Sequence, residues 1–524
     1  MSASFEHQKQ ELLARRRRII FNNDGCDARL PLSELSAPAD FLNVRTTPLA
    51  GSHVDTISYC VNSGFGLCKI NSRVAQVLPV RPDGGNAAVH ALIEQGTDPL
   101  RVVADFAHNH AMEVFASLRM NDTHDGGTKN HWMYEANRFK NENPECLMGS
   151  YEQRDSFRKW SAVDYDHEKV RAMALAMIGE ICAGYDVDGI ELDFFRHPVL
   201  FKDTVSGRPV TDAQRARVSD MMAQAAAVLR HAGEKRGRPF LLAVRTPDDP
   251  DYDATIGMDL ERWMREGWID IYIPSGYFRQ RSWRDSVELG HSHGVKVYPG
   301  LSDSRVGGGH HKDRLRASDE GYRARAANAW QAGADGIYVF NLFDPQRRIW
   351  SEMGDPEALQ TMDKVYFASA RGCRKMPGGG YPYESFIQIP TLNPEAPLPL
   401  LPGGRQVVRI ELAEKPEGRP ATKSPALTLS IKTGIPEGPG LARVDMDTEL
   451  NVVFNGHLPA ASEHRENWRC YCLEPGWLRP GENTVEVIHP GQTPGLHLLD
   501  VMVTVNRSGQ PLDTAYLDQT RKKM

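Results

Sequence analysis

Two carboxylate residues, Glu191 and Asp193, stand two positions apart in the stretch 187–198, which reads Val-Asp-Gly-Ile-Glu-Leu-Asp-Phe-Phe-Arg-His-Pro. The stretch alternates as a β-strand does, so both acids share one face while Ile190 and Leu192 share the other. Burying a carboxylate is costly unless it meets a partner, a ligand or a polar cavity. The pattern therefore predicts a strand whose acidic face lines a polar cavity. An ion pair with a neighbouring arginine is the alternative for each acid.

Nearby carboxylates can cleave a glycosidic bond, because one acid protonates the leaving oxygen and a second carboxylate acts as nucleophile or base. Asp193 is the first candidate for this chemistry, since it stands nearer the carboxyl end of the strand. Glu191 would lie about 6.6–7 Å deeper along the strand and charge-couple to Asp193. Asp303 is the candidate second carboxylate, and the alternatives are loop acids that could equally be solvated or cap turns: Asp122, Asp125 and Asp248.

Short apolar strands alternate with helical stretches between residues 18 and 365, the pattern of β/α units around a parallel sheet. We expect eight strands, at 18–22, 55–60, 113–120, 187–195, 239–245, 269–274, 296–300 and 336–340. Polar and acidic residues gather where these strands end, and that end carries the active site in a (β/α)8 TIM barrel. The sequence predicts an α/β protein with such a barrel.

Strand alternation places charges of both signs inside the predicted barrel. Arg119 and Arg245 share the inward face with Glu191 and Asp193 on neighbouring strands, so they can satisfy these acids or position a polar ligand. The side chains expected to bind substrate come from these strands and the loops that follow them: Arg119, Asn121, Asp122, His124, Arg196, His197, Arg245, Tyr277, Tyr298 and Asn341.

The cluster Asn121-Asp122-Thr123-His124-Asp125 also admits a metal site, because Asp and His at close spacing bind zinc or manganese. However, no HxH or HExxH motif stands at the end of a strand, so we predict no metal and no cofactor. His124 is expected to hydrogen-bond a sugar hydroxyl or a neighbouring carboxylate. Walker, nucleotide-binding and Gly-x-Ser-x-Gly motifs are absent from the sequence.

The chain divides by composition into five segments. We expect an N-terminal extension at 1–17, the barrel at 18–375, a Pro-rich linker at 376–402, a smaller all-β, jelly-roll-like sandwich at 403–506 and a tail at 507–524. In the sandwich segment, short alternating strands at 407–412, 426–433, 450–454, 484–488 and 496–505 are separated by Gly-rich turns.

The composition of the 524 residues excludes several classes of function. The net charge of −6 offers no footprint for nucleic acid, and no apolar run is long enough to span a membrane. The N-terminus lacks the apolar core of a secretory signal and the eight cysteines are scattered, so we expect a cytoplasmic protein, or a secreted or periplasmic one if a leader is missing. Assembly into a homo-oligomer is compatible with the sequence.

Three stretches together resemble family-10-like glycosyl hydrolases. These are Asp-Gly-Ile-Glu-Leu-Asp-Phe-Phe-Arg-His-Pro at 188–198, the segment 258–277 and Ala-Asp-Gly-Ile-Tyr-Val-Phe-Asn at 334–341. The resemblance implies a barrel that acts on a saccharide. A looser similarity to family 18 glycosidases fails at Phe195, which stands where that family carries its catalytic glutamate. The segment 478–487 resembles galactose-binding-like jelly rolls, some of which bind sugar while others only pack.

Three functions remain open from the sequence. The first is a glycoside hydrolase that uses Asp193, favoured by the paired acids and the resemblance. The second is a metal-dependent hydrolase or lyase on the same barrel, based on the loop at 121–125. The third is a saccharide-binding protein without catalysis, because the second carboxylate is uncertain.

Overall fold

The computed structural model describes residues 3–510, apart from 153–158, 206, 276–278, 303–314, 369–385, 387–391, 393–396, 416–425, 439–440 and 463–467. Tyr277 and Asp303, two of the predicted site residues, lie outside these described residues. Within the described ranges, no helix combines the length and the apolar character needed to cross a membrane.

Eight parallel strands close into a barrel. In spatial order they are β1 (Ile19–Asn23), β2 (Val54–Cys60), β5 (Glu113–Arg119), β6 (Gly189–Asp193), β7 (Leu241–Pro247), β8 (Ile271–Ser275), a strand in two parts formed by β9 (Lys296–Val297) and β10 (Gly300–Ser302), and β11 (Ile337–Phe340). Pairing of β11 with β1 and of β10 with β8 closes the ring. All eight predicted strands are confirmed, each within about two residues of its expected ends.

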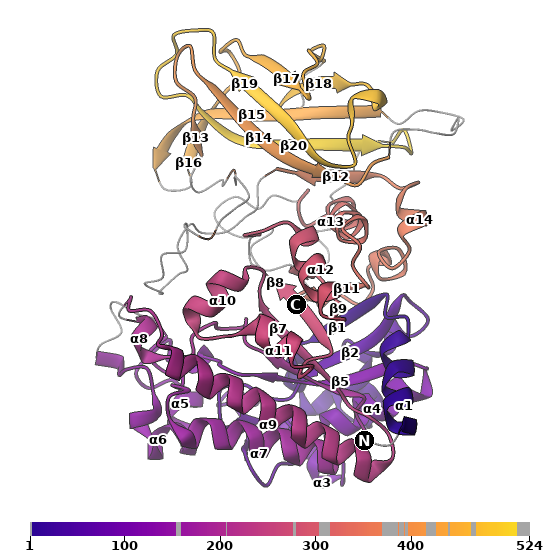
Figure 1. Cartoon of the computed structure of the whole chain (residues 1–524), viewed down its shortest axis with the longest axis vertical. Coiled ribbons are helices and arrows are strands. Elements are labelled where there is room, and N and C mark those ends of the chain that lie inside the picture. Colours follow the sequence, from indigo (N-terminus) through magenta and orange to yellow (C-terminus); the bar gives the residue numbers. More distant parts are fainter. Residues whose placement is uncertain are drawn as a thin grey trace.

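Helices cover the outside of the barrel (Figure 1). They are α1 (Ala3–Ala14), α2 (Pro38–Asn43), α3 (Ala87–Glu94), α4 (Pro99–Asn109), α5 (Trp132–Ala136), α6 (Arg138–Glu142), α7 (Glu168–Gly184), α8 (Lys202–Val205), α9 (Asp212–Arg236), α10 (Pro250–Ile256), α11 (Leu260–Arg265), α12 (Trp283–Ser292), α13 (Asp319–Gln331) and α14 (Pro356–Leu359). The longest, α9, begins with a capping box of Thr211 and Gln214 and ends at Gly237, whose φ of 72° suits a residue without a side chain.

The amino end of the barrel is closed by apolar side chains and ion pairs. Leu12 of α1 joins a buried cluster with Ile20, Phe115 and Tyr298. The buried Arg17 donates to Glu113 at 2.6 Å, which neutralises both charges at this end. Chemistry on a substrate is therefore restricted to the opposite, carboxyl-terminal end of the strands.

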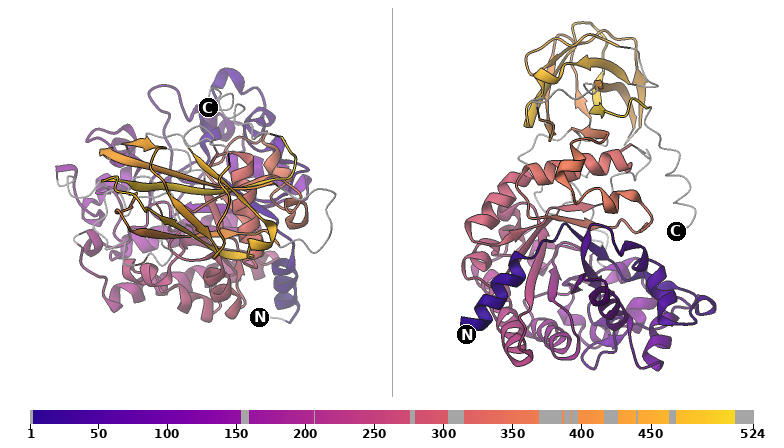
Figure 2. Two further views of the ribbon diagram at one scale, coloured as in Figure 1. Left: turned by 90° about the horizontal axis from the view of Figure 1, so that it is seen from above. Right: turned by 90° about the vertical axis from the view of Figure 1, so that its right-hand side faces the viewer.

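Two antiparallel sheets form the C-terminal sandwich. One contains β12 (Lys364–Phe367), β20 (His497–Asn506), β15 (Ala426–Gly438) and β16 (Leu441–Asp445), with β13 (Leu398–Pro399) and β18 (Arg469–Leu473) paired at its sides. The other contains β14 (Arg405–Leu412), β19 (Gly481–Ile488) and β17 (Asn451–Phe454). The predicted architecture of a TIM barrel followed by a β-sandwich is confirmed, and Figure 2 shows these two bodies from two further directions.

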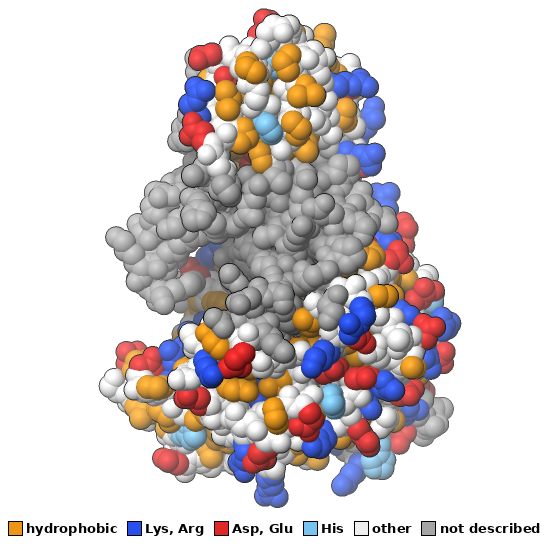
Figure 3. Space-filling view, turned by 90° about the vertical axis from the view of Figure 1, so that its left-hand side faces the viewer, with side chains coloured by type: hydrophobic (Ala, Val, Ile, Leu, Met, Phe, Trp, Pro, Cys, Tyr) orange, Lys and Arg blue, Asp and Glu red, His pale blue; other side chains and the backbone are white. Residues whose placement is uncertain are grey.

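The sandwich is attached to the barrel by ion pairs as well as by apolar contacts. Arg279, which follows β8, donates to Glu411 of β14 at 2.6 Å. A second link joins two buried side chains, Arg316 in the turn before α13 and Asp500 of β20. On the face seen in Figure 3, charges of both signs are mixed over the barrel, while hydrophobic side chains gather on the sandwich.

The pairing of β12 and β13 bears on the predicted domain boundaries. β12 falls inside the segment 18–375 and β13 inside the Pro-rich segment 376–402, yet both pair with β20 of the sandwich. Proline is tolerated in an edge strand, so a Pro-rich composition does not exclude such pairing. We therefore propose that the sandwich begins at about Lys364.

Deleting the chain from Pro402 onward is expected to lower the melting temperature by about 10 °C or more, because β12 loses its partner and buried ion pairs are broken. Tyr366, buried in β12, also loses its bond to Glu414. Thermal unfolding of the truncated chain measures the change in stability, and kcat/KM measures any change in activity. A stable truncation that loses only polymer affinity would identify a binding module, whereas outright loss of turnover would place the sandwich in the active site.

Candidate active site

Asp193 is flanked by two arginines at the carboxyl-terminal end of the barrel. In the register of the sheet its Cα pairs with Arg119 on β5 and with Arg245 on β7. All three side chains are buried. The predicted convergence of these charges inside the barrel is therefore present in the structure.

Both carboxylate oxygens of Asp193 accept hydrogen bonds. Oδ2 accepts from the Arg245 guanidinium at 3.0 Å, and Oδ1 accepts from the backbone N–H groups of Phe195 and Arg196 at 3.0 and 2.9 Å. These contacts suit an ionised carboxylate, since a protonated one would need an acceptor. The ion pair named as the alternative for Asp193 is thus present. It favours an ionised role, as nucleophile or charge stabiliser, over the role of proton donor.

Glu191 lies one layer deeper and is held by hydroxyl groups. Its oxygens accept from Ser58 at 2.5 Å, Ser117 at 2.8 Å and Tyr338 at 2.9 Å, and its side chain is fully buried. Burial and the nearby charge of Asp193 raise the pKa of Glu191 to about 6. Because three hydroxyl groups bond the Glu191 carboxylate, we propose that it acts on the site through its charge.

Replacing Glu191 with glutamine is expected to reduce turnover by less than about tenfold, below the usual effect of removing a general acid or base. It should also move the acidic limb of the pH–rate profile to lower pH. The reason is that Glu191, whose pKa is raised to about 6, changes its charge in the acidic range, whereas the amide does not titrate. The profile of kcat/KM against pH measures the shift, and an unchanged limb would leave Glu191 a purely structural residue.

The loop after β5 carries a buried aspartate that holds an exposed histidine. Asp122 accepts from Arg119 at 2.9 Å and from Nδ1 of His124 at 2.5 Å. Burial opposes the charge of Asp122, but His124 and Arg119 hold its pKa well below the usual range. The His124 side chain is 43% exposed, and its Nε2 accepts from Arg196 at 2.6 Å. The predicted bond of His124 to a neighbouring carboxylate is confirmed.

Two further groups support this loop. His197 is buried, its Nδ1 accepts from the N–H of Thr123 at 3.1 Å, and burial together with Arg196 lowers its pKa well below the usual value. Asp125 is fully buried against Lys140 at 2.6 Å, so it is a structural ion pair and neither a solvated nor a catalytic acid.

Two residues predicted to bind substrate lie elsewhere. The amide of Asn121 donates to the carbonyls of Val163 and Val199 and accepts from the N–H of Val163, so it fastens two loops together. Tyr298 is buried at the amino end of the barrel, where burial raises its pKa to about 12 against the effect of Arg17. Both expectations are corrected. Tyr298 belongs to the short loop between β9 and β10. The seventh barrel strand continues past this loop and ends at Ser302.

Of the remaining predicted site residues, the structure describes Asn341. Asn341 directly follows β11 at the carboxyl-terminal end of the barrel, with a φ of 60° that asparagine tolerates. Tyr277 and Asp303 lie outside the described residues, so the second carboxylate stays a proposal.

Asp248, an alternative second carboxylate, is buried between two loops. Its Oδ2 accepts from the N–H of Gln280 at 3.0 Å, while its Oδ1 has no hydrogen-bond partner within the part of the chain that is described. Burial raises the pKa of Asp248 to about 7, although the N–H groups of the second loop oppose this. The carboxyl group therefore gains protons when the chain folds.

Replacing Asp248 with asparagine is expected to change the free energy of unfolding relative to wild type more favourably at pH 8 than at pH 5. A pKa near 7 in the folded state, above the value of about 3.9 in the unfolded chain, makes wild-type stability fall as pH rises through this window, by up to roughly 1.4 kcal/mol per pH unit. The amide does not titrate, so the variant lacks this fall in stability with rising pH. Urea unfolding at both pH values measures the change, and equal pH dependence in the two proteins would contradict it.

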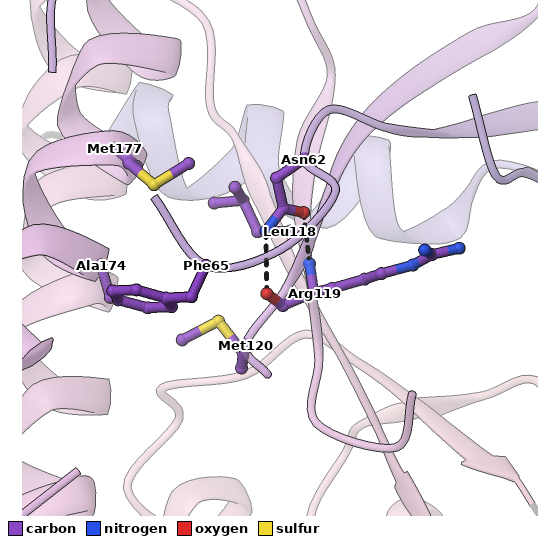
Figure 4. Close-up of a pocket in the computed structure, with 7 residues that line it drawn as sticks. All are labelled: Asn62, Phe65, Leu118, Arg119, Met120, Ala174 and Met177. Carbon is purple, nitrogen blue, oxygen red and sulfur yellow. Dashed lines mark hydrogen bonds between the residues drawn. The ribbon is translucent and has the colours of Figure 1, made fainter. Parts of the chain in front are cut away.

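A water-sized cavity of about 10 Å³ lies outside the barrel wall, between β5 and α7. Figure 4 shows Phe65, Met120 and Met177 around it, with the Arg119 side chain pointing away from them. Asn62 bonds the backbone N–H and carbonyl of Arg119, both at 2.9 Å. The cavity is an apolar packing defect, and Asn62 fixes the strand end from which Arg119 enters the barrel.

Sequence reasoning missed the groups that hold Glu191. Ser117 shares the inward face with Arg119, and Tyr338 is on the last predicted strand, so their alternation could have placed both in the barrel interior. The loop residues Asp24, Arg45 and Lys69 were also missed. Arg45 donates to Asp24 at 2.5 Å, and Arg45, Arg119 and Lys69 hold the pKa of the partly exposed Asp24 below its usual range. Single loop residues of this kind carry no periodic signal.

Metal ligation finds no support in the described residues. They contain no group of three or more His, Cys, Asp or Glu side chains placed to hold an ion. Both nitrogens of His124 are already engaged, one by Asp122 and the other by a guanidinium that would repel a cation.

No family model matches the chain, and no curated protein matches it either. Among solved structures, it is similar to α-L-fucosidase isoenzyme 2 from Paenibacillus thiaminolyticus (11% identity, TM-score 0.42), with 91% of this chain and 100% of that one covered. It is also similar to a family GH27 β-L-arabinopyranosidase from Geobacillus stearothermophilus (10% identity, TM-score 0.37, 97% and 100% covered). A third is a family 18 N-acetylglucosaminidase from Paenibacillus barengoltzii (13% identity, TM-score 0.36, 66% and 99% covered). These values are too low to indicate an activity.

Proposed function

We propose that the protein is a glycoside hydrolase that cleaves a glycosidic bond at the carboxyl-terminal end of its barrel. The observation that carries the proposal is Asp193, a buried carboxylate at the end of the fourth barrel strand with an arginine in register on each side. The family-10-like motif at 188–198 supports the same reading. The substrate is a saccharide, and its sugar and linkage are left open.

Asp193 would act on the anomeric carbon as the sugar develops positive charge. Arg245 and the two backbone N–H groups fix its carboxylate, so little reorganisation is needed when the charge appears. Arg119 keeps its position through Asn62 and Asp122. Asp303, which follows the seventh strand in the sequence, stays the proposed second carboxylate of the site. Asn341 and Tyr277 are proposed as further substrate contacts at the same end.

Turnover of a panel of aryl glycosides and oligosaccharides tests the proposal. Each is incubated with wild-type protein and with the Asp193→Asn variant, and released phenol or reducing sugar is measured. Hydrolysis by wild type alone is expected. If no member is hydrolysed while a saccharide binds wild type, the chain is a binding protein without catalysis.

A further inference from the structure

His124 is an exposed imidazole beside the most buried charges of the site. Its side chain is 43% exposed, whereas that of Asp122, its partner, is fully buried. A buried carboxylate bonded to Nδ1 fixes the orientation of the ring and leaves Nε2 to face outward, the arrangement of Asp–His pairs that transfer protons. The pair therefore has the parts of a proton-transfer device.

The contacts of His124 define which ring nitrogen donates and which accepts. A guanidinium cannot accept a hydrogen bond, so Nε2, which meets Arg196 at 2.6 Å, is an acceptor in this state. Asp122 is ionised, so Nδ1 carries the hydrogen and donates to it. The ring is thus oriented by Asp122, and Nε2 is the atom that can exchange a proton.

His124 is tied to Asp193 by two short routes. Arg196 gives its backbone N–H to Asp193 and its guanidinium to His124. On the other side, Arg119 pairs in register with Asp193 and donates to Asp122, which holds His124. The histidine and the carboxylate therefore share two arginine neighbours at the carboxyl-terminal end of the barrel.

We infer that His124 is the acid/base residue of this site, with Asp122 as its positioning residue. The inference rests on the proposed glycosidase function and adds a residue to it. It also accounts for the proton donor, a role that the fully accepting contacts of Asp193 do not suit.

The chemistry balances over two steps. Before the first step the Arg196 guanidinium leaves Nε2, and Nε2 takes up a proton from solvent. In the first step, an oxygen of Asp193 bonds to the anomeric carbon, the glycosidic C–O bond breaks, and Nε2–H of the imidazolium gives its proton to the leaving oxygen. In the second, water bonds to the anomeric carbon and gives a proton to Nε2 while the bond to Asp193 breaks. The carboxylate and the imidazolium are both regenerated.

The test uses His124→Asn, because the asparagine Nδ2 can keep the bond to Asp122 while the Nε2 position is lost. Phenyl and 2,4-dinitrophenyl glycosides of a sugar that wild type hydrolyses are compared. For the phenyl glycoside, kcat/KM is expected to fall at least about a hundredfold. For the dinitrophenyl glycoside it should stay near wild type, since this leaving group needs no proton. The kcat for the dinitrophenyl glycoside should fall, because the second step also uses His124. Azide should restore this kcat, since it attacks the anomeric carbon in place of water and needs no base.

His291→Gln is the matched control. His291 is also 43% exposed and is also bonded to an aspartate, Asp335 at 2.8 Å, but this pair lies at the amino end of the barrel. Its kinetics should equal those of wild type. His124→Gln, whose folding is checked by thermal unfolding, serves as a second variant and should give the same dependence on leaving group.

The outcomes separate the inference from the proposed function. Suppose that wild type hydrolyses the glycosides and that this hydrolysis needs Asp193. If the His124 variants then lose activity equally on both leaving groups, or lose none, the role of His124 is overturned and the proposed function stands. A wild type that hydrolyses no glycoside would overturn both. Asp122→Asn should reduce kcat for the phenyl glycoside with little change in KM, and a change in KM alone would contradict its positioning role.

Discussion

Replacing Asp193 with asparagine is expected to lower kcat/KM at least about a hundredfold, the usual scale for losing a catalytic acid, base or nucleophile. Asparagine has nearly the same shape and can still accept from the backbone N–H groups of Phe195 and Arg196. It has neither the charge nor the nucleophilic oxygen that the anomeric carbon requires. Steady-state kinetics on any glycoside that wild type hydrolyses measure the loss.

The stability of this variant must be measured with its activity. Asp193 neutralises Arg245, and both side chains are only 1% exposed, so the amide leaves a buried guanidinium without its counter-charge. Loss of turnover in protein that is folded at the assay temperature supports a catalytic role. Turnover near wild type would remove Asp193 from the mechanism.

Replacing Arg245 with methionine is expected to reduce the free energy of unfolding by about 3–5 kcal/mol, the usual cost of breaking a buried ion pair from one side. Among the described residues, the substitution leaves the Asp193 carboxylate with backbone donors alone, and it removes a guanidinium that lies 3.8 Å from the centre of the Phe340 ring. Urea unfolding of wild type and variant measures the difference. A loss below about 1 kcal/mol would contradict the strength assigned to this pair.

The double variant Asp193→Asn with Arg245→Met separates stability from catalysis. Removing both partners leaves neither charge of this pair buried and unpaired, so its free energy of unfolding should exceed that of either single variant. Its activity should stay as low as that of Asp193→Asn alone. Recovery of turnover together with stability would mean that the pair only supports the fold.

Alternation along the strands predicted the barrel and its inward charges. The acidic face of β6 and the parity of Arg119 and Arg245 follow from the period of two in a strand, and a closed parallel sheet brings these positions together. The carboxyl-terminal location of Asp193 follows from chain direction alone. These features depend on the alternation and direction of single strands, so they can be predicted from the sequence.

Features that depend on where a strand breaks or a loop folds were not predictable. Tyr298 was expected at the active end, but the strand is interrupted after Val297 and resumes at Gly300. Asn121 has the inward parity of β5, yet its amide is used by Val163 and Val199 from distant loops. The pairing of β12 with β20 joins segments far apart in sequence, where periodicity gives no partner.

Trapping of the covalent intermediate tests the role of Asp193 most directly. Wild-type protein is treated with the 2,4-dinitrophenyl 2-deoxy-2-fluoro derivative of a sugar that it hydrolyses, and the labelled peptide is identified by mass spectrometry. The fluorine slows both steps, and the activated leaving group lets the first proceed. The account predicts one sugar attached to Asp193. A label on another carboxylate, or none while the parent glycoside is hydrolysed, would contradict it.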